Sequence, residues 1–358
     1  MTTRSSLIER GFVRPTKMGW WTGCLTLSLM AAGFFWLFSE PAASAKEGQS
    51  AALDSEVLSP ADKAGIAEVL RLKSELGDQV WPDLSRVDIP LVLFNDRYEF
   101  LIGEVDPPSP WQVVHGDDFS GRPYHRRLGA NFQAFAVPVG TRWAGSLGTL
   151  EQMSSKTPFR LSRELHAMLM LHEVFHAFQA TLVPQRFARA MSVYRSENRY
   201  PYKDPGFSAA WNSEGGALAD ALTALETTTI SDLVRKFLDT REARRSQINL
   251  DSELISFEYE LEWLEGLAKY AEVRFYELAA SRASESAYAS YRSDHPLWPA
   301  DLARLRRNLG GQGGDLRFYL SGVAQAMLLD RLRPGWKAKA FGEKSNLEDF
   351  LRGAVTPD

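Results

Sequence analysis

The spacing of apolar residues changes near residue 160, and the change predicts a domain with two parts. Before it, two runs rich in β-branched and aromatic residues, 89–94 and 132–139, predict strands that follow a helix over 61–77. After it, apolar residues recur every three or four positions, as they do on one face of a helix. The helices predicted for this second part are 161–182, 208–225, 230–238, 250–280 and 316–331.

We therefore expect an α+β fold that is mostly helical, in a single domain over residues 61–358. Its first part, 61–160, is a small α/β unit with an open strand edge, and its second part, 161–358, is helical. Residues 107–123 are rich in turn-forming residues and separate the two predicted strands.

Two long connections, 184–211 and 282–314, interrupt the predicted helices. Both are candidate lids or binding loops, because long loops of compact domains often have such roles. The second ends in a glycine-rich run, 310–314, which lacks the spacing and the Lys-Ser/Thr pair of a phosphate-binding loop. We interpret this run as a flexible turn, with Asp315 capping the helix that follows.

Residues 1–45 have the layout of an export segment: a basic leader, an uncharged apolar run over 18–38, and a site of small residues at Ala43-Ser44-Ala45. Pro41 ends the apolar helix just before that site and favours cleavage after Ala45. An uncleaved anchor is the alternative, since about 20 apolar residues span a bilayer. Both outcomes place the domain outside the cytoplasm, as a periplasmic, secreted or membrane-anchored protein. Small and acidic residues over 46–60 predict a tether.

Composition narrows the choice of partners. The formal net charge of −4 gives no basic face for nucleic acid. The single cysteine, Cys24, lies within the apolar run, which excludes a disulfide scaffold and a cysteine-based zinc fold. Contact with a membrane is expected only through residues 18–38, and only if the leader stays attached.

The segment with the clearest chemistry is His172-Glu173-Val174-Phe175-His176, in the middle of the helix predicted over 161–182. Residues four apart on a helix lie on one face, so both imidazoles can bind one ion, and zinc takes such nitrogen ligands at about 2 Å. Glu173 points away from the two ligands and can take a proton from water that zinc has acidified. Buried histidines and a glutamate without partners would be costly, which favours a metal over a purely structural role.

This His-Glu-x-x-His helix resembles that of the zincin zinc metallopeptidases, whose third ligand comes from elsewhere in the chain. Residues 265–272, Glu-Gly-Leu-Ala-Lys-Tyr-Ala-Glu, are similar to the Glu-Gly-x-Ala-x-Tyr-x-Glu segment of zinc aminopeptidases, in which the first glutamate binds zinc. This gluzincin-like resemblance implies Zn²⁺ as the cofactor, with His172, His176 and Glu265 as ligands and Glu173 as the general base.

Glu214 is the alternative third ligand, because its surroundings faintly resemble the third-ligand helix of thermolysin. Glu265 has the stronger case. The neighbouring Gly266 costs about 1 kcal/mol in a helix interior relative to alanine, which indicates that another backbone, such as that of the metal helix, comes close.

Other residues are candidates for supporting roles at the site. Glu272 and Asp220 are candidate carboxylates behind zinc-bound histidines, and Tyr319 is a candidate donor to an oxyanion. Zincins commonly offer a strand edge to an extended peptide, and the strand predicted over 132–139 is a candidate for that role. Expected to be solvated or at the surface, with no part in the site, are Glu258, Glu260, Glu262, His115, His125 and His295; His166 lies on another face of the metal helix and is not counted as a ligand.

The leading hypothesis is an exported zinc-dependent hydrolase, specifically a metallopeptidase that acts on a peptide or protein substrate. A first alternative is a zinc enzyme that cleaves a different bond, namely an amidase or deacylase that acts on an envelope component. A second alternative is a non-catalytic envelope-binding module stabilised by zinc, in which Glu173 would have no function.

Overall fold

The computed structural model describes residues 55–129, 132–157, 161–291 and 296–356. The predicted export segment, most of the tether and His295 lie outside these residues. Within the described ranges, no helix combines the length and the apolar character that crossing a membrane requires.

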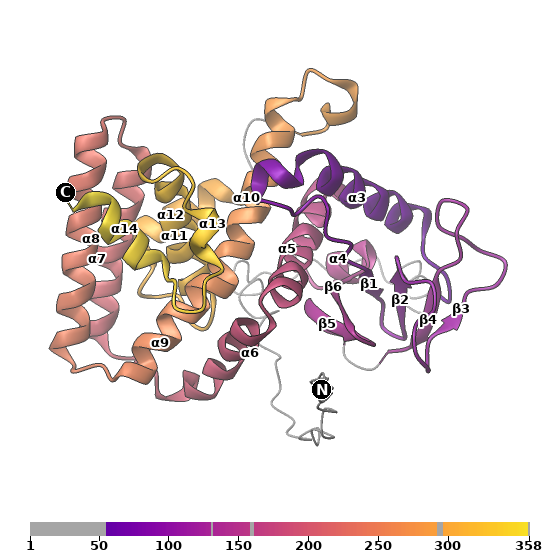
Figure 1. Cartoon of the computed structure of the whole chain (residues 1–358), viewed down its shortest axis with the longest axis horizontal. Coiled ribbons are helices and arrows are strands. Elements are labelled where there is room, and N and C mark those ends of the chain that lie inside the picture. Colours follow the sequence, from indigo (N-terminus) through magenta and orange to yellow (C-terminus); the bar gives the residue numbers. More distant parts are fainter. Residues whose placement is uncertain (1–54, 130–131, 158–160, 292–295, 357–358) are drawn as a thin grey trace, which may run out of the picture.

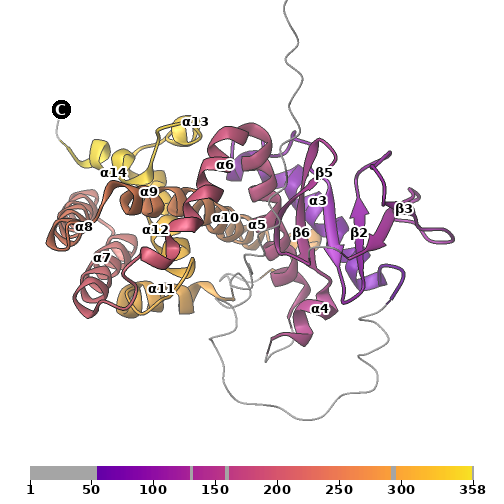
Figure 2. The same ribbon diagram turned by 90° about the horizontal axis from the view of Figure 1, so that it is seen from below.

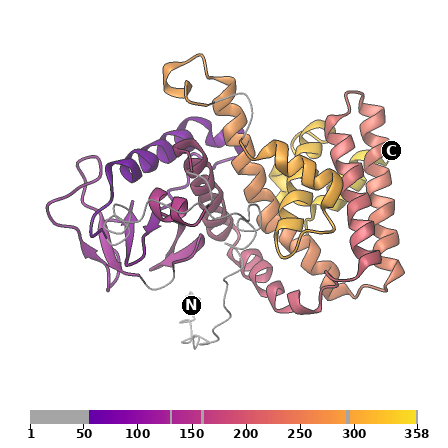
Figure 3. The same ribbon diagram turned by 180° about the vertical axis from the view of Figure 1, so that it is seen from behind.

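The molecule has a sheet-containing part and a helical part, which meet where α5 (Arg163–Leu182) packs against α10 (Leu267–Ser281) (Figure 1). Seen from behind, the sheet and the hairpin of α7 (Pro205–Thr223) and α8 (Thr227–Gln247) lie at opposite ends (Figure 3). The chain passes from one part to the other along α5. The prediction of a mostly helical α+β fold is confirmed.

The sheet has six strands in the order β3-β4-β2-β1-β6-β5, so β5 forms one edge. Strands β1 and β6 pair in parallel, and the other neighbouring pairs are antiparallel. Helix α5 packs against β5 and β6, and α3 (Pro60–Val80) packs against α5 (Figure 2). The strands are β1 (Leu91–Phe94), β2 (Tyr98–Ile102), β3 (Gln112–Val113), β4 (His125–Leu128), β5 (Phe135–Val139) and β6 (Arg142–Gly148), and the short α4 (Leu150–Ser155) follows β6.

Strand β6 is one that the apolar pattern does not predict, because two glycines weaken its strand propensity. One of them, Gly145, is required by packing. A Cβ at Gly145 would lie 2.8 Å from the backbone nitrogen of Val174 in α5. The missing side chain therefore allows the sheet to lie directly behind the His-Glu-x-x-His motif.

Side chains in the sequence fix where the main helices begin. Ser162, Asp204 and Asp251 each accept a hydrogen bond from a backbone N–H three residues further on, and so cap α5, α7 and α9. The remaining elements of the helical part are α6 (Pro184–Ser192), η1 (Val193–Arg199), α9 (Ser252–Leu261), η2 (Glu262–Gly266), η3 (Ser286–Tyr288), α11 (Trp298–Asn308), α12 (Leu316–Leu332), α13 (Lys337–Ala340) and α14 (Leu347–Val355).

The prediction that 184–211 and 282–314 are long loops is wrong for both. The first contains α6, η1 and the start of α7, and the second contains η3 and α11. Both α6 and α11 carry a proline in their first turn, Pro184 and Pro299. The missing N–H of proline costs nothing there and its fixed φ suits a helix, so these prolines mark helix starts.

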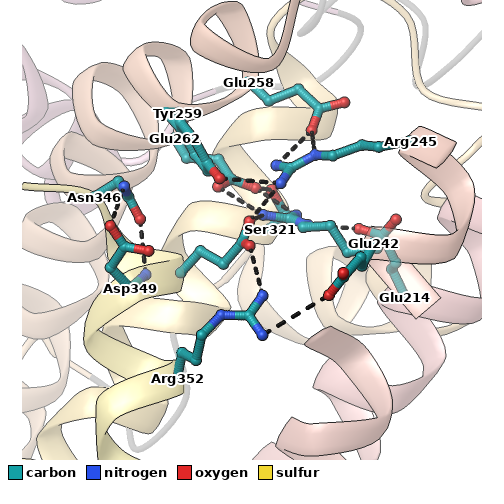
Figure 4. A network of polar contacts seen from close by, with 12 residues as sticks. Glu214, Glu242, Arg245, Glu258, Tyr259, Glu262, Ser321, Asn346, Asp349 and Arg352 are labelled. Atoms are coloured by element: carbon teal, nitrogen blue, oxygen red, sulfur yellow. Dashed lines mark hydrogen bonds and ion pairs between the residues drawn. The ribbon is translucent and has the colours of Figure 1, made fainter. Parts of the chain in front are cut away.

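A cluster of buried arginine–glutamate ion pairs joins the helices of the second part (Figure 4). Arg241 of α8 donates to Glu214 of α7 at 2.8 Å and to Glu262 of η2 at 2.7 and 3.0 Å. Arg244 donates to Glu214 and, at 2.6 Å, to Glu258 of α9. The charges are therefore paired away from water, as buried ions must be.

The expectation that Glu258, Glu260 and Glu262 form a solvated face is wrong. Glu258 and Glu262 are almost completely buried in the ion-pair cluster, and Glu260 is half-buried beside Arg189 at 2.9 Å. Acidic side chains are rarely buried unless they are paired. The arginines that pair with Glu258 and Glu262 come from another helix, which a local sequence pattern does not reveal.

The cluster gives the stability of the protein a predictable dependence on pH. Burial alone would raise the pKa of Glu258, but Arg244 and Arg245 outweigh burial and hold that pKa well below its usual value. Such a carboxylate stabilises the fold above its unfolded-state pKa of about 4.3, and this contribution is lost as the pH falls toward the folded-state pKa. We expect Glu258→Gln to lower the free energy of unfolding at neutral pH by about 3–5 kcal/mol, because it leaves buried arginines unpaired.

Urea unfolding of both proteins between neutral pH and about pH 3 measures this effect, and the acid limb of the variant is expected to be the flatter one. Glu242→Gln is the matched control, since that side chain is 70% exposed and lies 3.9 Å from Arg352 at the rim of the cluster. Its effect should stay within about 0.5 kcal/mol. Equal losses in the two variants would contradict the assignment of Glu258 to a stabilising buried pair.

Candidate metal centre

The His-Glu-x-x-His motif of α5 lies inside the molecule and not on its surface. His176 is completely buried, and His172 and Glu173 are nearly so. The ring of Phe135, in the edge strand β5, lies 4.5 Å from the ring of His176. The motif is therefore enclosed between the sheet and the helical part, with the end of the sheet beside it.

Glu265 of η2 faces the two histidines and completes a group of three possible ligand atoms. Its Oε2 is 3.2 Å from Nε2 of His176 and 3.7 Å from Nε2 of His172, and the two Nε2 atoms are 3.1 Å apart. Ligand atoms at about 2.0–2.1 Å from a tetrahedral zinc ion lie about 3.3 Å from one another. The three distances therefore fit a single metal ion.

The other nitrogen of each imidazole faces an oxygen atom. Nδ1 of His172 is 3.3 Å from Oε2 of Glu272, and Nδ1 of His176 is 3.1 Å from Oε1 of Gln179. A neutral ring that carries its proton on Nδ1 presents a lone pair at Nε2. Two lone pairs and a carboxylate oxygen then converge, which is unfavourable unless a cation lies among them. Two imidazoles and one carboxylate are a donor set that suits Zn²⁺.

Without a metal ion, a proton would take the place of that cation. Burial opposes the charged form of His172, but Glu265 and Glu272 outweigh burial and raise the pKa of His172 to about 9. Burial would raise the pKa of Glu265, but His176 and His172 hold it far below its usual value. Burial lowers the pKa of His176, which stays neutral. A metal ion that binds at neutral pH would therefore displace a proton from His172.

Of the two carboxylates expected behind the histidines, the structure places only one there. Glu272 lies beside His172 and also receives a hydrogen bond of 2.8 Å from Lys269, whose charge partly offsets that of the carboxylate. Asp220 is exposed at the surface of α7, 3.3 Å from Arg306 of α11. It makes no contact with the histidines.

Glu265 reaches the histidines because the helix that carries it widens for one turn. Residues Glu262–Gly266 form a π-helix, in which hydrogen bonds run from residue i to i+5. In an uninterrupted α-helix, positions 262 and 265 would share one face. In the wider turn, Glu262 contacts Arg241 and Ser321, whereas Glu265 contacts the two histidines. The π turn therefore separates the ion-pair cluster from the candidate metal site.

Two glycines allow α12 to cross this π turn at short range. A Cβ on Gly266 would lie 2.5 Å from Cα of Gly322, and a Cβ on Gly322 would lie 2.6 Å from Cα of Gly266. The expectation that another backbone comes close to Gly266 is confirmed, but this backbone is that of α12 and not that of the metal helix. The crossing also carries Tyr319 to the site.

The ring of Tyr319 stacks on the imidazole of His172, with the ring centroids 5.4 Å apart and 10° between the planes. Burial, together with the carboxylates of Glu265 and Asp315, raises the pKa of Tyr319 well above its ordinary value. Its phenol therefore stays protonated and can donate a hydrogen bond. Asp315 occupies the N-cap position of α12, as expected, but its side chain makes no capping hydrogen bond.

Two residues of the site, Tyr194 and Gln179, were not assigned a role from the sequence. The hydroxyl of Tyr194 donates to Oε1 of Glu265 at 3.0 Å. Tyr194 lies in η1, within the segment that was expected to be a loop, and no pattern in the sequence singles it out. Gln179 does have a signal, because it follows His176 by three positions and so shares its helix face.

Oε2 of Glu173 meets no hydrogen-bond partner in the part of the chain that the structure describes. Burial raises the pKa of Glu173 to about 8, with the charges of Glu265 and Glu272 adding to the effect and that of His172 opposing it. A pKa near neutrality suits a group that exchanges a proton with water or substrate. A cation bound beside it would lower that pKa.

Glu214, the alternative third ligand, lies outside the site. One of its oxygens accepts a hydrogen bond from Arg241 and the other from Arg244, and its side chain is completely buried in the ion-pair cluster. Both oxygens are therefore already held by positive charges, so this carboxylate has no reason to bind a cation.

The other histidines of the described residues have separate environments. Nε2 of His166 lies 2.8 Å from the carbonyl oxygen of Gly148, so this ring joins α5 to the end of β6. His115 is exposed, as expected. The expectation that His125 is at the surface is wrong, since His125 is buried in β4.

Comparisons of the chain with protein-family models, with curated proteins and with solved structures gave no match. What the site can do therefore has to be argued from its geometry. The ligand atoms that converge from α5 and η2, and the free oxygen of Glu173 beside them, are the basis of that argument.

The crossing of η2 and α12 predicts opposite effects for two Gly→Ala substitutions. An added methyl group normally stabilises a helix interior by about 1 kcal/mol. Gly266→Ala is expected to destabilise the protein by about 1–3 kcal/mol, because its Cβ meets the backbone of α12. Gly216→Ala in α7 is the control and should stabilise, since its nearest neighbour would be 3.7 Å away. Thermal unfolding measures both, and a stabilising Gly266→Ala would contradict the close crossing.

The geometry also predicts which glutamate would hold a zinc ion at this candidate site. Glu265→Ala should lose zinc during dialysis against a weak chelator, because it removes one of three ligands. Glu214→Gln should keep its zinc and instead unfold more easily, because it leaves Arg241 and Arg244 without their full charge partner. Metal analysis and urea unfolding separate the two effects. The reverse pattern would transfer the ligand role to Glu214.

Proposed function

We propose that this protein is an exported zinc-dependent hydrolase that cleaves peptide bonds. The observation that carries the proposal is the convergence of Nε2 of His172, Nε2 of His176 and Oε2 of Glu265. Beside them lies Oε2 of Glu173, which has no hydrogen-bond partner among the described residues. Location outside the cytoplasm is proposed from the layout of residues 1–45 alone.

The division of roles follows from the donor atoms. His172, His176 and Glu265 would hold the metal ion, and Glu272 and Gln179 would keep the two imidazoles in place from behind. When bound, zinc supplies a Lewis acid that acidifies water and polarises a carbonyl group. Three protein ligands leave a coordination position open, as catalytic zinc sites require.

Two side chains have the properties needed for proton transfer and charge stabilisation. Oε2 of Glu173 would accept a proton from the attacking water and then donate it to the leaving amine. The phenol of Tyr319, kept neutral by burial and nearby carboxylates, would donate a hydrogen bond to the negative oxygen that develops on the substrate. Its ring is oriented by stacking on His172.

The sheet supports a peptide as substrate. Strand β5 is the last strand in the sheet, and its outer edge has no strand partner within the described ranges. An extended peptide can add to such an edge through backbone hydrogen bonds. Phe135 of β5 contacts His176, so a peptide bound along this strand would pass the candidate metal site.

A non-catalytic role is less compatible with the arrangement of residues. Structural zinc sites are closed by four protein ligands, whereas the group found among the described residues has three. A structural site also has no use for Glu173, whose free oxygen makes burial of this carboxyl costly.

The test is a change of one atom in the proposed base. Glu173→Gln keeps the shape of the side chain and removes its basicity, so zinc content should stay near that of the wild type. Cleavage of a mixed peptide library should fall by about 10²- to 10⁴-fold, the usual size of a general-base contribution. Mass spectrometry of the products and metal analysis provide the two readouts.

Glu164→Gln is the matched control, because it makes the same chemical change in the first turn of the same helix, away from the site. Full activity in Glu173→Gln would exclude the mechanism. Wild-type protein that binds zinc and cleaves cell-wall fragments but no peptide would instead support the amidase alternative.

A further inference from the structure

Gln179 joins the two halves of the candidate metal centre. It lies on α5, three residues after His176, and its side chain is completely buried. A buried amide has two hydrogen-bond donors and an acceptor to satisfy, and each one left unpaired costs about 1–3 kcal/mol. The partners of this amide therefore show what holds it in place.

Both ends of the amide have partners in the site. Oε1 lies 3.1 Å from Nδ1 of His176. Nε2 donates to the backbone carbonyl of Trp263 at 2.9 Å and lies 3.4 Å from that of Leu264. These two carbonyls belong to the π turn and immediately precede Glu265. One amide thus links the second histidine to the backbone that carries the third ligand.

The two carbonyl groups also decide which way the amide points. An amide can be turned by 180° with little change in shape, so its orientation must be inferred from its partners. A carbonyl oxygen only accepts hydrogen bonds, so the NH₂ group of Gln179 has to face Trp263 and Leu264. Its oxygen must then face His176, and Nδ1 of that ring must carry the proton. Nε2 of His176 is left with a lone pair directed at His172 and Glu265.

We propose that Gln179 is a positioning residue that sets the tautomer of His176 and anchors the π turn beneath Glu265, so that both ligands are ready for the metal before it binds. The proposal rests on the zinc site of the proposed function. It explains why an amide of this length is needed. A carboxylate would accept from His176 but repel the carbonyl of Trp263, and an apolar side chain would leave both groups unpaired.

The first test compares Gln179→Met with Gln325→Met in the full-length protein. Gln325 is a fully buried glutamine of α12 whose amide atoms have no hydrogen-bond partner among the described residues. Both variants replace a buried glutamine by a side chain of similar length. Zinc affinity, measured by competition with a chelator, should fall about 10- to 100-fold in Gln179→Met, as for other groups that support metal ligands. It should stay unchanged in Gln325→Met.

The absorption spectrum of the cobalt-loaded protein reports the geometry of the ligands and not the stability of the fold. It should change in Gln179→Met and match the wild type in Gln325→Met. The spectrum of Gln179→Glu should lie between those of Gln179→Met and the wild type, because a carboxylate keeps the acceptor for His176 but lacks the donor to Trp263. Wild-type affinity and spectrum in Gln179→Met would overturn the proposal while leaving the zinc site intact.

A second measurement uses the wild-type protein alone, so it does not depend on whether a variant folds. Nitrogen chemical shifts of ¹⁵N-histidine-labelled wild-type protein, without metal, report the tautomer of each ring. We expect His176 to carry its proton on Nδ1, and a proton on Nε2 would overturn the proposal. A wild-type protein that binds neither zinc nor cobalt would overturn the proposed function, and this inference with it.

Discussion

The carboxylate of Glu265 imposes the main constraint on this structure, because it is completely buried and faces two imidazoles. An ion removed from water needs charges or hydrogen bonds that replace its solvation. Tyr194 supplies one hydrogen bond to Oε1, and the histidines face Oε2. Three helical segments therefore have to meet at one point: α5 with the histidines, η1 with the tyrosine, and η2 with the carboxylate.

A second system of buried charges lies on the same helix, one turn away. Glu262 belongs to the arginine–glutamate cluster and Glu265 to the candidate metal centre, although only two residues separate them. The π turn allows this separation, and both neighbours of the turn stabilise it. Gln179 of α5 binds its carbonyl groups on one side, and α12 crosses it through Gly322 on the other. Ser321 also donates to Glu262 at 2.5 Å, which ties α12 to the ion-pair cluster.

This arrangement places the candidate reaction site where the two parts of the molecule join. The sheet contributes Phe135 beside His176, and the helical part contributes Glu265 and Tyr319. Gly145 lets the sheet approach α5, and the pair of Gly266 and Gly322 lets α12 approach η2. The ligands are therefore held by segments packed at backbone contact, which favours a site that is organised before the metal binds.

The apolar pattern predicted the fold class and most of the long helices correctly, because those helices have an apolar face of regular period. It stopped α8 at residue 238, although the helix continues to Gln247. The buried face of α8 continues with Arg241, Arg244 and Arg245, which a pattern based on hydrophobicity reads as solvent-exposed. The same limitation led to the wrong prediction that Glu258 and Glu262 form a solvated face. Helices α6 and α11 were not predicted because each has a proline in its first turn, and proline is also a sign of a loop.

The sequence by itself determined which residues can carry the chemistry. The spacing of His172 and His176 places both on one face of any helix they form, and the segment that starts at Glu265 was the better candidate for a third ligand. Only the tertiary structure decided that Glu265 and not Glu214 faces the histidines, since one widened turn directs Glu265 to α5 while Arg241 and Arg244 hold Glu214. It also decided the roles of Gln179 and Tyr194. Their partners lie 84 and 71 residues away in the chain, and contacts of that range depend on how helices pack and not on local periodicity.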